Sequence, residues 1–447
     1  MQKLIHTIIQ KITELLSNKS NLADVIHAAS IVMFIRVLGA GVLYISHILL
    51  ARWMGNSEFG IYAYAWVWLT VLGVIAPFGL NIAVVRFLPD YLSKKKWRRV
   101  IGVIRHSQLF VLCSSLILTA LAMLTVYTTR SWIPDYYITP LYIAFASIPI
   151  IAYIDLYEGM SRSFNWIKLA FTPSYILLPT ALILLIIVII VAGITPTASI
   201  ALSVVFIAAI LALMLQVWIF HRKIHTIVPQ SKPVYHSLHW LRNALPFLLV
   251  DVFYLVLANT DIILLGKYME PDKIAIYYAA VKTSNLILFI LFAVSAISAT
   301  KFSELYAQKK HQQLSELYYG SVRWTLLPAL IASVILFLAG KLLLSFFGPA
   351  FVDGYVVLVI LTIGILFKSA VGPIDLLLNM TENQKPCAVV FGYSAGLNII
   401  LNLTLIPYFG LIGAAFATTL SVVVSTVWLA ALTKKNLNIH VFRSFHW

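Results

Sequence analysis

Apolar segments of about 20 residues recur along almost the whole chain, separated by short polar stretches. A helix of that length crosses roughly 30 Å of hydrocarbon, whereas a membrane strand is shorter and alternates between apolar and polar side chains. Because these segments are continuously apolar, the pattern predicts membrane-spanning helices. We expect about twelve spans, near residues 28–50, 59–83, 101–126, 138–160, 168–192, 198–220, 243–266, 274–300, 322–347, 356–380, 387–406 and 411–432.

The composition agrees with an all-α integral membrane protein. Hydrophobic residues make up 61% of the chain and charged residues only 11%, and the mean hydropathy is +0.93. A soluble core covered by a polar surface does not have this composition. Cys113 and Cys387 fall inside expected spans without a motif around them, so we expect buried thiols.

The distribution of basic residues predicts the orientation, because positively charged loops stay in the cytoplasm. The loops on one side carry Arg86, Lys94, Lys95, Lys96, Arg98, Arg99, Arg162, Lys168, Arg222, Lys223, Lys232, Arg242, Lys301, Lys309, Lys310, Arg323 and Lys385. The opposite loops carry Arg52, Arg130, Lys267, Lys273 and Lys341. We therefore expect both termini in the cytoplasm. The net charge of +16 then lies on one membrane face, where it favours lipid headgroups over nucleic acid as partners.

The chain repeats itself at an offset of 215 residues. "ILLARWMGNSEFGIYAYA" from residue 48 aligns with "ILLGKYMEPDKIAIYYAA" from residue 263, and "RFLPDYLSKKK" at 86 aligns with "KFSELYAQKKH" at 301. Each copy begins at an odd-numbered span and holds six spans. The repeat therefore predicts two six-helix bundles of the same orientation, related by an axis along the membrane normal.

This repeat divides the chain into five parts. They are an amphipathic segment at 1–27, a first lobe at 28–220, a cytoplasmic linker at 221–242, a second lobe at 243–432 and a cytoplasmic tail at 433–447. The first part suits a helix on the membrane surface, with a frayed helix in solvent as the alternative. The linker has four histidines without acidic or cysteine ligands, so we expect no metal. No phosphate-binding G-x-x-x-x-G-K-[ST] loop is present, and we expect no cofactor.

Several charges fall where lipid would make them costly. A charged side chain at the bilayer centre costs about 2.5 kcal/mol or more, so such residues usually face water or a partner. Arg36 shares a helical stripe with His47, which indicates one polar face. The expected substrate-binding cations of a watery lumen are Arg36, Lys282, Lys368, Arg105 and His47.

The acidic counterparts are candidates for ion coupling. They are Asp251, Asp155, Glu158 and Asp261. The offset of 215 places Arg36 at the position of Asp251, so a pair across the pseudo-axis is one interpretation, and a pair between Asp251 and Lys282 is another. Internal salt bridges that hold the bundles together are the structural alternative. The functional hypothesis is an anionic substrate, because a guanidinium binds phosphate through two parallel hydrogen bonds.

Three segments carry a resemblance to a known family. "FFGPAFVDGYVVLVILTIG", "IPYFGLIGAAFATTLS" and "FGIYAYAWVWLTVLGVIAPFGLNIAVVRFL" resemble recurring segments of polysaccharide transporters in the multidrug/oligosaccharidyl-lipid/polysaccharide exporter superfamily. This group includes the O-antigen flippases of the Wzx type. The resemblance covers the chain from about residue 28 onward. Asp261 in "TDIILLG" matches a frequent aspartate of the family, where a structural role is implied by its position near the outer interface.

The resemblance implies a flippase and not an enzyme. It would move an undecaprenyl-diphosphate-linked oligosaccharide from the cytoplasmic to the periplasmic leaflet of a bacterial inner membrane, for O-antigen or lipopolysaccharide synthesis. Two lobes would alternate in access, coupled to H⁺ or Na⁺ because no nucleotide site is visible. Membrane lipids and polysaccharide assembly proteins are the implied partners.

Two other functions remain open on the sequence alone. A cation or drug antiporter of the same fold would need an acidic lumen, whereas the lumen expected from this sequence is balanced or basic. A membrane-embedded polysaccharide polymerase or glycosyltransferase would normally carry a long loop with paired carboxylates.

Overall fold

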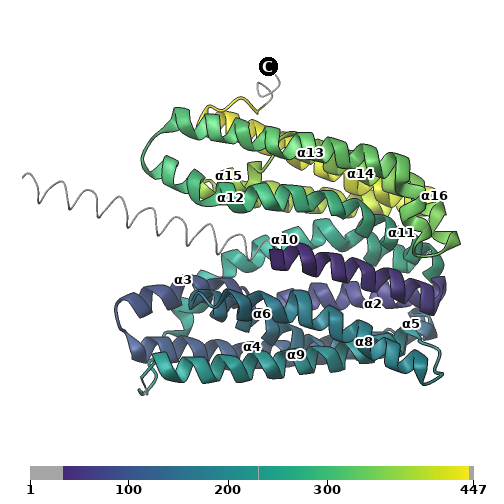
Figure 1. Ribbon diagram of the computed structural model, residues 1–447, viewed down its shortest axis with the longest axis horizontal. Helices are drawn as coiled ribbons and strands as arrows, with labels where there is room; N and C mark the ends of the chain where they lie inside the picture. The colour runs from purple at the N-terminus through teal and green to yellow at the C-terminus, as the bar shows by residue number, and fades with distance from the viewer. Residues whose placement is uncertain (1–33, 230, 442–447) are drawn as a thin grey trace, which may run out of the picture.

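The chain folds into two stacked groups of long helices (Figure 1). This computed structural model describes residues 34–229 and 231–441, and within them every regular element is helical. The expected amphipathic segment at 1–27 and the end of the expected tail lie outside the described residues. The all-α fold class is confirmed.

The first lobe begins with the helix Phe34–Met54. Its other elements are α2 (Asn56–Ile75), α3 (Leu80–Ser93), α4 (Trp97–Thr128), η1 (Arg130–Trp132), α5 (Asp135–Ala146), α6 (Ile148–Ser163), α7 (Ile167–Thr172), η2 (Pro173–Leu177), α8 (Leu178–Val191) and α9 (Ala198–Ile227). The second lobe contains α10 (Ser237–Tyr268), α11 (Pro271–Ser284), η3 (Asn285–Ile287), α12 (Leu288–Ala307), α13 (His311–Ser345), η4 (Pro349–Gly354), α14 (Tyr355–Ala370), α15 (Ile374–Met380) and α16 (Gln384–Leu437).

The described residues contain 11 helices that are long and apolar enough to cross a membrane. The last of them, α16, has 54 residues and would measure about 81 Å if it were straight. It bends back at Gly410, whose φ of 55° and ψ of −131° are not helical. A Cβ on Gly413 would lie 2.4 Å from the Leu405 carbonyl oxygen, which shows that the chain reverses there. α16 is therefore two spans, and twelve spans result as the hydropathy predicts.

Two features differ in detail from the expected boundaries. α9 continues to Ile227 and α10 begins at Ser237, so residues 228–236 connect the lobes instead of 221–242. Both helices run past their apolar parts into the basic region, which hydropathy alone does not show. The expected span at 356–380 is broken between α14 and α15 by Gly372, with a φ of 62°, and by Pro373.

The two lobes contact each other through α2 and α11, and also through α10, which packs against α2 and α3 of the first lobe. In Figure 1 the ribbons of α2 and α11 meet at the right, and the helices of the two lobes spread apart at the left. We call the left end, which carries the linker 228–236, the linker end and the opposite end the far end. α2 and α11 start at equivalent places of the repeat, because Asn56 and Pro271 differ by 215 positions. The repeat therefore brings its two copies of this helix together on the pseudo-axis.

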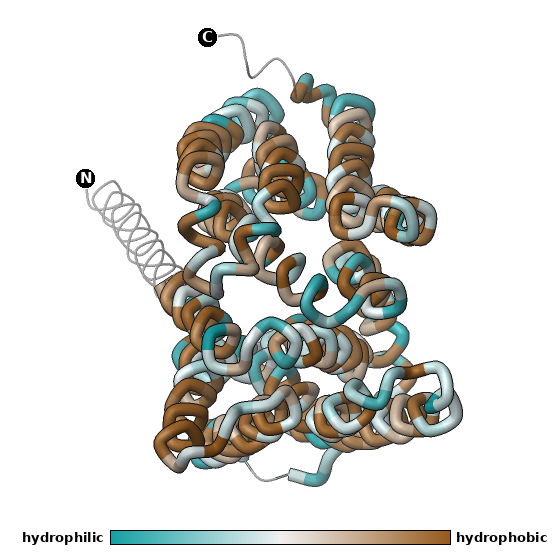
Figure 2. Tube along the Cα trace, turned by 90° about the vertical axis from the view of Figure 1, so that its right-hand side faces the viewer, coloured by the Kyte–Doolittle hydropathy of each residue, from teal (hydrophilic) through white to brown (hydrophobic). Residues whose placement is uncertain are grey.

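The outer sides of both lobes are apolar. Figure 2 shows the helices end-on from the far end, with brown, hydrophobic positions along the outside of each lobe. Large side chains are exposed there, among them Leu116 at 51%, Val188 at 63% and Leu338 at 83%. Such exposure is unfavourable in water and expected against lipid.

The close contact of α2 with α11 rests on a glycine and gives a testable prediction. A Cβ on Gly60 would lie 1.9 Å from the Pro271 carbonyl oxygen. Gly60→Ala should therefore force the helices apart and lower the free energy of unfolding by about 1–3 kcal/mol. Thermal unfolding in detergent measures this effect. Gly396→Ala is the matched control, because nothing lies within 4 Å of its Cβ position. Equal unfolding midpoints for the two variants would contradict the packing.

Candidate functional site

An arginine of the first lobe holds the second lobe at the far end. Arg52 donates hydrogen bonds from Nε to the Phe346 carbonyl oxygen at 2.6 Å and from Nη2 to the Ser345 carbonyl oxygen at 3.0 Å. These carbonyls end α13, where the helix dipole is negative. A cation at this place therefore stabilises both the helix end and the contact between the lobes.

An aromatic cluster closes the same part of the seam between the lobes. His47 is only 1% exposed, and its Nε2 lies 3.3 Å from the Tyr278 hydroxyl of the second lobe. The rings of Phe59, Tyr62 and Trp66 each lie 6.4 Å from the His47 ring. His47 thus lies among aromatic rings, away from the watery lumen in which the sequence interpretation placed it.

Neighbouring polar contacts complete this closure. The Tyr44 hydroxyl lies 3.0 Å from the Thr283 hydroxyl across the seam. Tyr44 and Phe59 also contact Phe347 of the second lobe, with ring centroids 5.6 Å and 6.4 Å apart. The far end is therefore shut by side chains from both lobes.

At the linker end the seam opens into a cleft of about 1180 Å³. α3 of the first lobe and α10, α15 and α16 of the second lobe line it. Its cations are Arg86, Arg242 and Lys385, and Asp251 is the only carboxylate among the described lining residues. None of these four residues forms an ion pair within the described part of the chain. The cleft therefore has a basic rim whose cations are not paired with the carboxylate in its lining.

The walls of this cleft are largely apolar. Phe247, Val250 and Phe253 of α10 face Val389 of α16 across it. Asp251 lies nine residues beyond Arg242 on α10, or about 14 Å deeper by helical rise. A ligand with an anionic head and an apolar part would find matching surfaces here.

Arg36 lies beside this seam but is turned into its own lobe. Its guanidinium carbon is 4.8 Å from the Phe171 ring centroid and 5.5 Å from that of Tyr175. Gly39 allows the two backbones to approach this closely. A Cβ at this position would lie 2.2 Å from the Tyr175 backbone oxygen. The Nε atom is buried and has no hydrogen-bond partner among the described residues. Cation–π contacts thus hold Arg36 while part of its hydrogen-bonding capacity stays unused.

Carboxylates of α6 lie near Arg36 without being locked onto it. Glu158 is 3.8 Å from Arg162 on its own helix, and Arg36 is close enough to act on its charge. Asp155 is close enough to interact with both Glu158 and Asp251. No ion pair joins Arg36 to Asp251 in the described residues, so the structure gives no support for that pairing across the pseudo-axis.

Lys282 has Asp261, not Asp251, as its acidic neighbour. Its Nζ lies 4.8 Å from the Tyr278 ring centroid, and it forms no ion pair in the described chain. Asp261 is 2% exposed and accepts hydrogen bonds from the Tyr277 hydroxyl at 2.6 Å and the Thr418 hydroxyl at 3.2 Å. Asp261 therefore joins α10 to α11 and α16.

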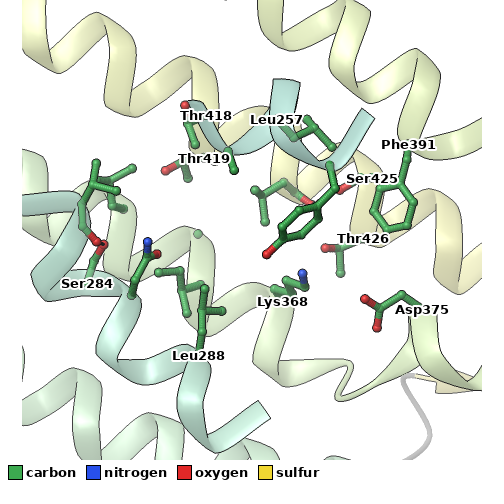
Figure 3. Close-up of a pocket in the computed structure, with 18 of the residues that line it drawn as sticks. Leu257, Ser284, Leu288, Lys368, Asp375, Phe391, Thr418, Thr419, Ser425 and Thr426 are labelled. Carbon is green, nitrogen blue, oxygen red and sulfur yellow. Dashed lines mark hydrogen bonds between the residues drawn. The ribbon is translucent and has the colours of Figure 1, made fainter. Parts of the chain in front are cut away.

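Lys368 lies in a separate cavity inside the second lobe. Figure 3 shows Lys368 and Asp375 toward one side of this cavity and Ser284 at the other. The cavity holds about 150 Å³, and its remaining polar lining is mainly hydroxyl groups, such as those of Thr418 and Thr426. It belongs to the second lobe alone, so the structure does not bring Lys368 to the inter-lobe cleft.

Arg105 is also separate from the other expected cations. It lines a pocket between α4, α9 and the linker, together with His221 and Lys232. The five expected cations therefore occupy four different surroundings. Arg36 and Lys282 lie near the seam and form no ion pair among the described residues.

The sequence interpretation did not include the cleft cations Arg86, Arg242 and Lys385 among its candidate site residues. Arg242 and Lys385 lie near the starts of α10 and α16, and the sequence pattern places all three among the basic residues expected to keep loops in the cytoplasm. Arg242 lies inside α10, five residues after its start, and Arg86 lies inside α3. Their places inside helices are the signal that could have separated them from ordinary loop charges.

Comparison with known proteins identifies the family. The polysaccharide biosynthesis protein family matches residues 25–300, and the MatE family matches residues 246–404. This chain belongs to the polysaccharide biosynthesis protein family. The resemblance to polysaccharide transporters of the exporter superfamily is thereby confirmed.

A relative and two solved structures agree with this family membership. The probable flippase AglR of Haloferax volcanii is 29% identical over 37% of this chain and 36% of its own length. The lipid II flippase MurJ, in an inward closed conformation, has a TM-score of 0.73 at 18% identity and covers 93% of this chain and 90% of its own. An inward-facing multidrug transporter of the MATE family also has a TM-score of 0.73, at 14% identity, with 93% and 99% covered. The structural likenesses show the fold: a multi-pass, two-lobe membrane protein.

Proposed function

We propose that this polysaccharide biosynthesis family member is a flippase for an undecaprenyl-diphosphate-linked oligosaccharide. It would carry the headgroup from the cytoplasmic to the periplasmic leaflet of a bacterial inner membrane, with the linker end in the cytoplasm. The observation that carries the proposal is the inter-lobe cleft, with its basic rim and apolar walls at one end and its closure at the other.

The physical chemistry of the cargo fits this cleft. A diphosphate-sugar headgroup cannot enter hydrocarbon unaided, whereas its polyprenyl tail need not leave it. The cleft volume of about 1180 Å³ exceeds the usual range for small-molecule pockets, roughly 300–1,000 Å³. Arg86, Arg242 and Lys385 would receive the diphosphate, and Phe247 and Phe253 would face the apolar part of the carrier.

The charge of the cleft separates this proposal from its rivals. An organic cation would meet three cations at the rim and a single carboxylate deeper in the cleft, which disfavours a cation or drug antiporter. A polymerase or glycosyltransferase would need space for paired catalytic carboxylates outside the membrane. The segments between the described helices are short, and the linker at 228–236 is among the longest.

Arg36 and Lys282 would act deeper in the seam. Both are cations without an ion pair in the described chain, and the Nε of Arg36 still needs an acceptor. A diphosphate passing between the lobes would supply that acceptor. Lys368, Arg105 and His47 lie elsewhere, and we give them no direct contact with the headgroup.

Asp155, Glu158 and Asp251 would couple the movement to H⁺ or Na⁺. Asp155 interacts with carboxylates from both lobes, Glu158 on α6 and Asp251 on α10. Neighbouring carboxylates repel one another unless a proton or cation neutralises them. Binding an ion here would therefore favour approach of the lobes at the linker end, and its release would favour separation.

The basic rim gives the first functional prediction. Arg86→Gln with Arg242→Gln should slow flipping of a fluorescent lipid-linked oligosaccharide in proteoliposomes by about tenfold or more, since each charge-assisted hydrogen bond contributes about 1.5–3 kcal/mol. Lys95→Gln with Lys310→Gln removes the same charge from exposed turns at the linker end and should leave the rate within about twofold. Full activity of the rim variant would contradict the proposal.

Arg36→Ala should also lose flipping while the protein still folds.

The carboxylates give the second functional prediction. Asp251→Asn should abolish the dependence of flipping on a proton or sodium gradient, with little change in the thermal midpoint. Asp261→Asn should retain that dependence and lower the midpoint, because its oxygens accept three hydrogen bonds in the described structure. Flipping rates with and without each gradient, together with thermal unfolding, test the pair. The reverse pattern would make Asp261 the coupling residue.

A further inference from the structure

A second basic pocket lies on the first lobe beneath the linker, outside the inter-lobe cleft. It holds about 710 Å³ between α4, α9 and the linker. Its basic side chains are Arg105, His221, His225 and Lys232, and its described lining includes no carboxylate. Arg105 and Lys232 therefore bring positive charge to this space, and the histidines add ring nitrogens that form hydrogen bonds.

The shape of this pocket is fixed by hydrogen bonds. Gln108 donates from Nε2 to the Tyr157 hydroxyl at 2.7 Å, and that hydroxyl lies 3.2 Å from Nε2 of His221. The Ser231 hydroxyl is buried without a partner among the described residues. A buried hydroxyl without a hydrogen-bond partner is unfavourable. A ligand in the pocket would supply the missing partner of Ser231.

The linker is attached to α4 beside the pocket, which holds Lys232 at the rim. The Val234 amide donates to the Arg98 carbonyl oxygen at 3.0 Å, and Arg98 Nε donates to the Lys232 carbonyl oxygen at 3.2 Å. Gly102 permits this approach, since a Cβ there would lie 2.1 Å from the Val234 carbonyl oxygen. The position of Lys232 is therefore set by the backbone.

An apolar stripe leads away from the pocket on each of its two helices. On α4 the residues at helical spacing after Arg105 are Leu109, Leu112 and Leu116, which are 64%, 38% and 51% exposed. On α9 the residues at helical spacing before His221 are Trp218, Met214 and Leu211, which are 52%, 63% and 51% exposed. Such stripes contact acyl chains in a membrane, so head and tail sites are continuous.

We propose that this pocket binds the phosphate headgroup of an anionic membrane phospholipid, with its acyl chains along α4 and α9. Basic pockets at the cytoplasmic ends of membrane helices suit such headgroups. The acyl stripes favour a phospholipid over a soluble phosphate, which needs no apolar surface. The bound lipid would hold the linker against the first lobe. This inference does not depend on the cargo of the inter-lobe cleft.

Lipid binding by native mass spectrometry tests the proposal on the full-length protein. Delipidated wild-type protein should retain one phosphatidylglycerol at concentrations where phosphatidylcholine does not bind. Arg105→Gln with Lys232→Gln should weaken phosphatidylglycerol binding by on the order of tenfold or more. The matched control is Lys168→Gln with Lys223→Gln, two exposed cations near the same end that do not line the pocket. This control should bind as the wild type does.

Three results would overturn the proposal. Equal weakening in both double variants would mean general attraction to a basic surface. Loss of binding in Arg86→Gln with Arg242→Gln, but not in the pocket variant, would place the lipid in the inter-lobe cleft. Displacement of the lipid by inorganic pyrophosphate at equal concentration would make a soluble anion the ligand. A thermal shift on adding phosphatidylglycerol, lost only in the pocket variant, would support the proposal independently.

Discussion

The closure of the far end is the interaction on which the rest of this structure depends. Arg52 ties the first lobe to the end of α13, and the His47 and Tyr278 rings fill the seam beside it. The lobes are joined there, and the cleft between them opens at the linker end. At the linker end α10 also packs against α3, so exchanging the far-end contacts for closure of the cleft requires a rocking movement of the lobes.

The charges inside the membrane region follow from this arrangement. The neighbouring carboxylates Asp155 and Asp251 belong to different lobes. The cations near the seam contact aromatic rings and form no ion pairs among the described residues: Arg36 lies over Phe171 and Lys282 over Tyr278. A cation held in this way keeps hydrogen-bond donors for a transient partner. A lysine locked into a salt bridge would have to break it first. Under the proposed function, the seam would therefore bind an anionic headgroup and release it again.

The sequence was sufficient for the fold and insufficient for the site. Continuous apolar spans and the 215-residue repeat predict twelve helices in two lobes, and α2 and α11 indeed meet as repeat equivalents. Hydropathy cannot show which way a helix is rotated, so His47 and Arg105 appeared to share a lumen that the structure does not give them. From the sequence, Arg86 and Arg242 resembled the basic residues that keep loops in the cytoplasm. Their depth and the direction of their side chains depend on tertiary packing, which a sequence pattern does not show.

Distances between spin labels at the two ends test the central claim, that the lobes rock between closure at the far end and closure at the linker end. One pair of labels would stand at Lys96 and Gln312 and the other at Arg130 and Asp353, all exposed, in a variant without native cysteines. Adding lipid-linked oligosaccharide should shorten the first distance and lengthen the second in part of the population. Unchanged distances at both ends in protein that still flips the lipid would contradict the account.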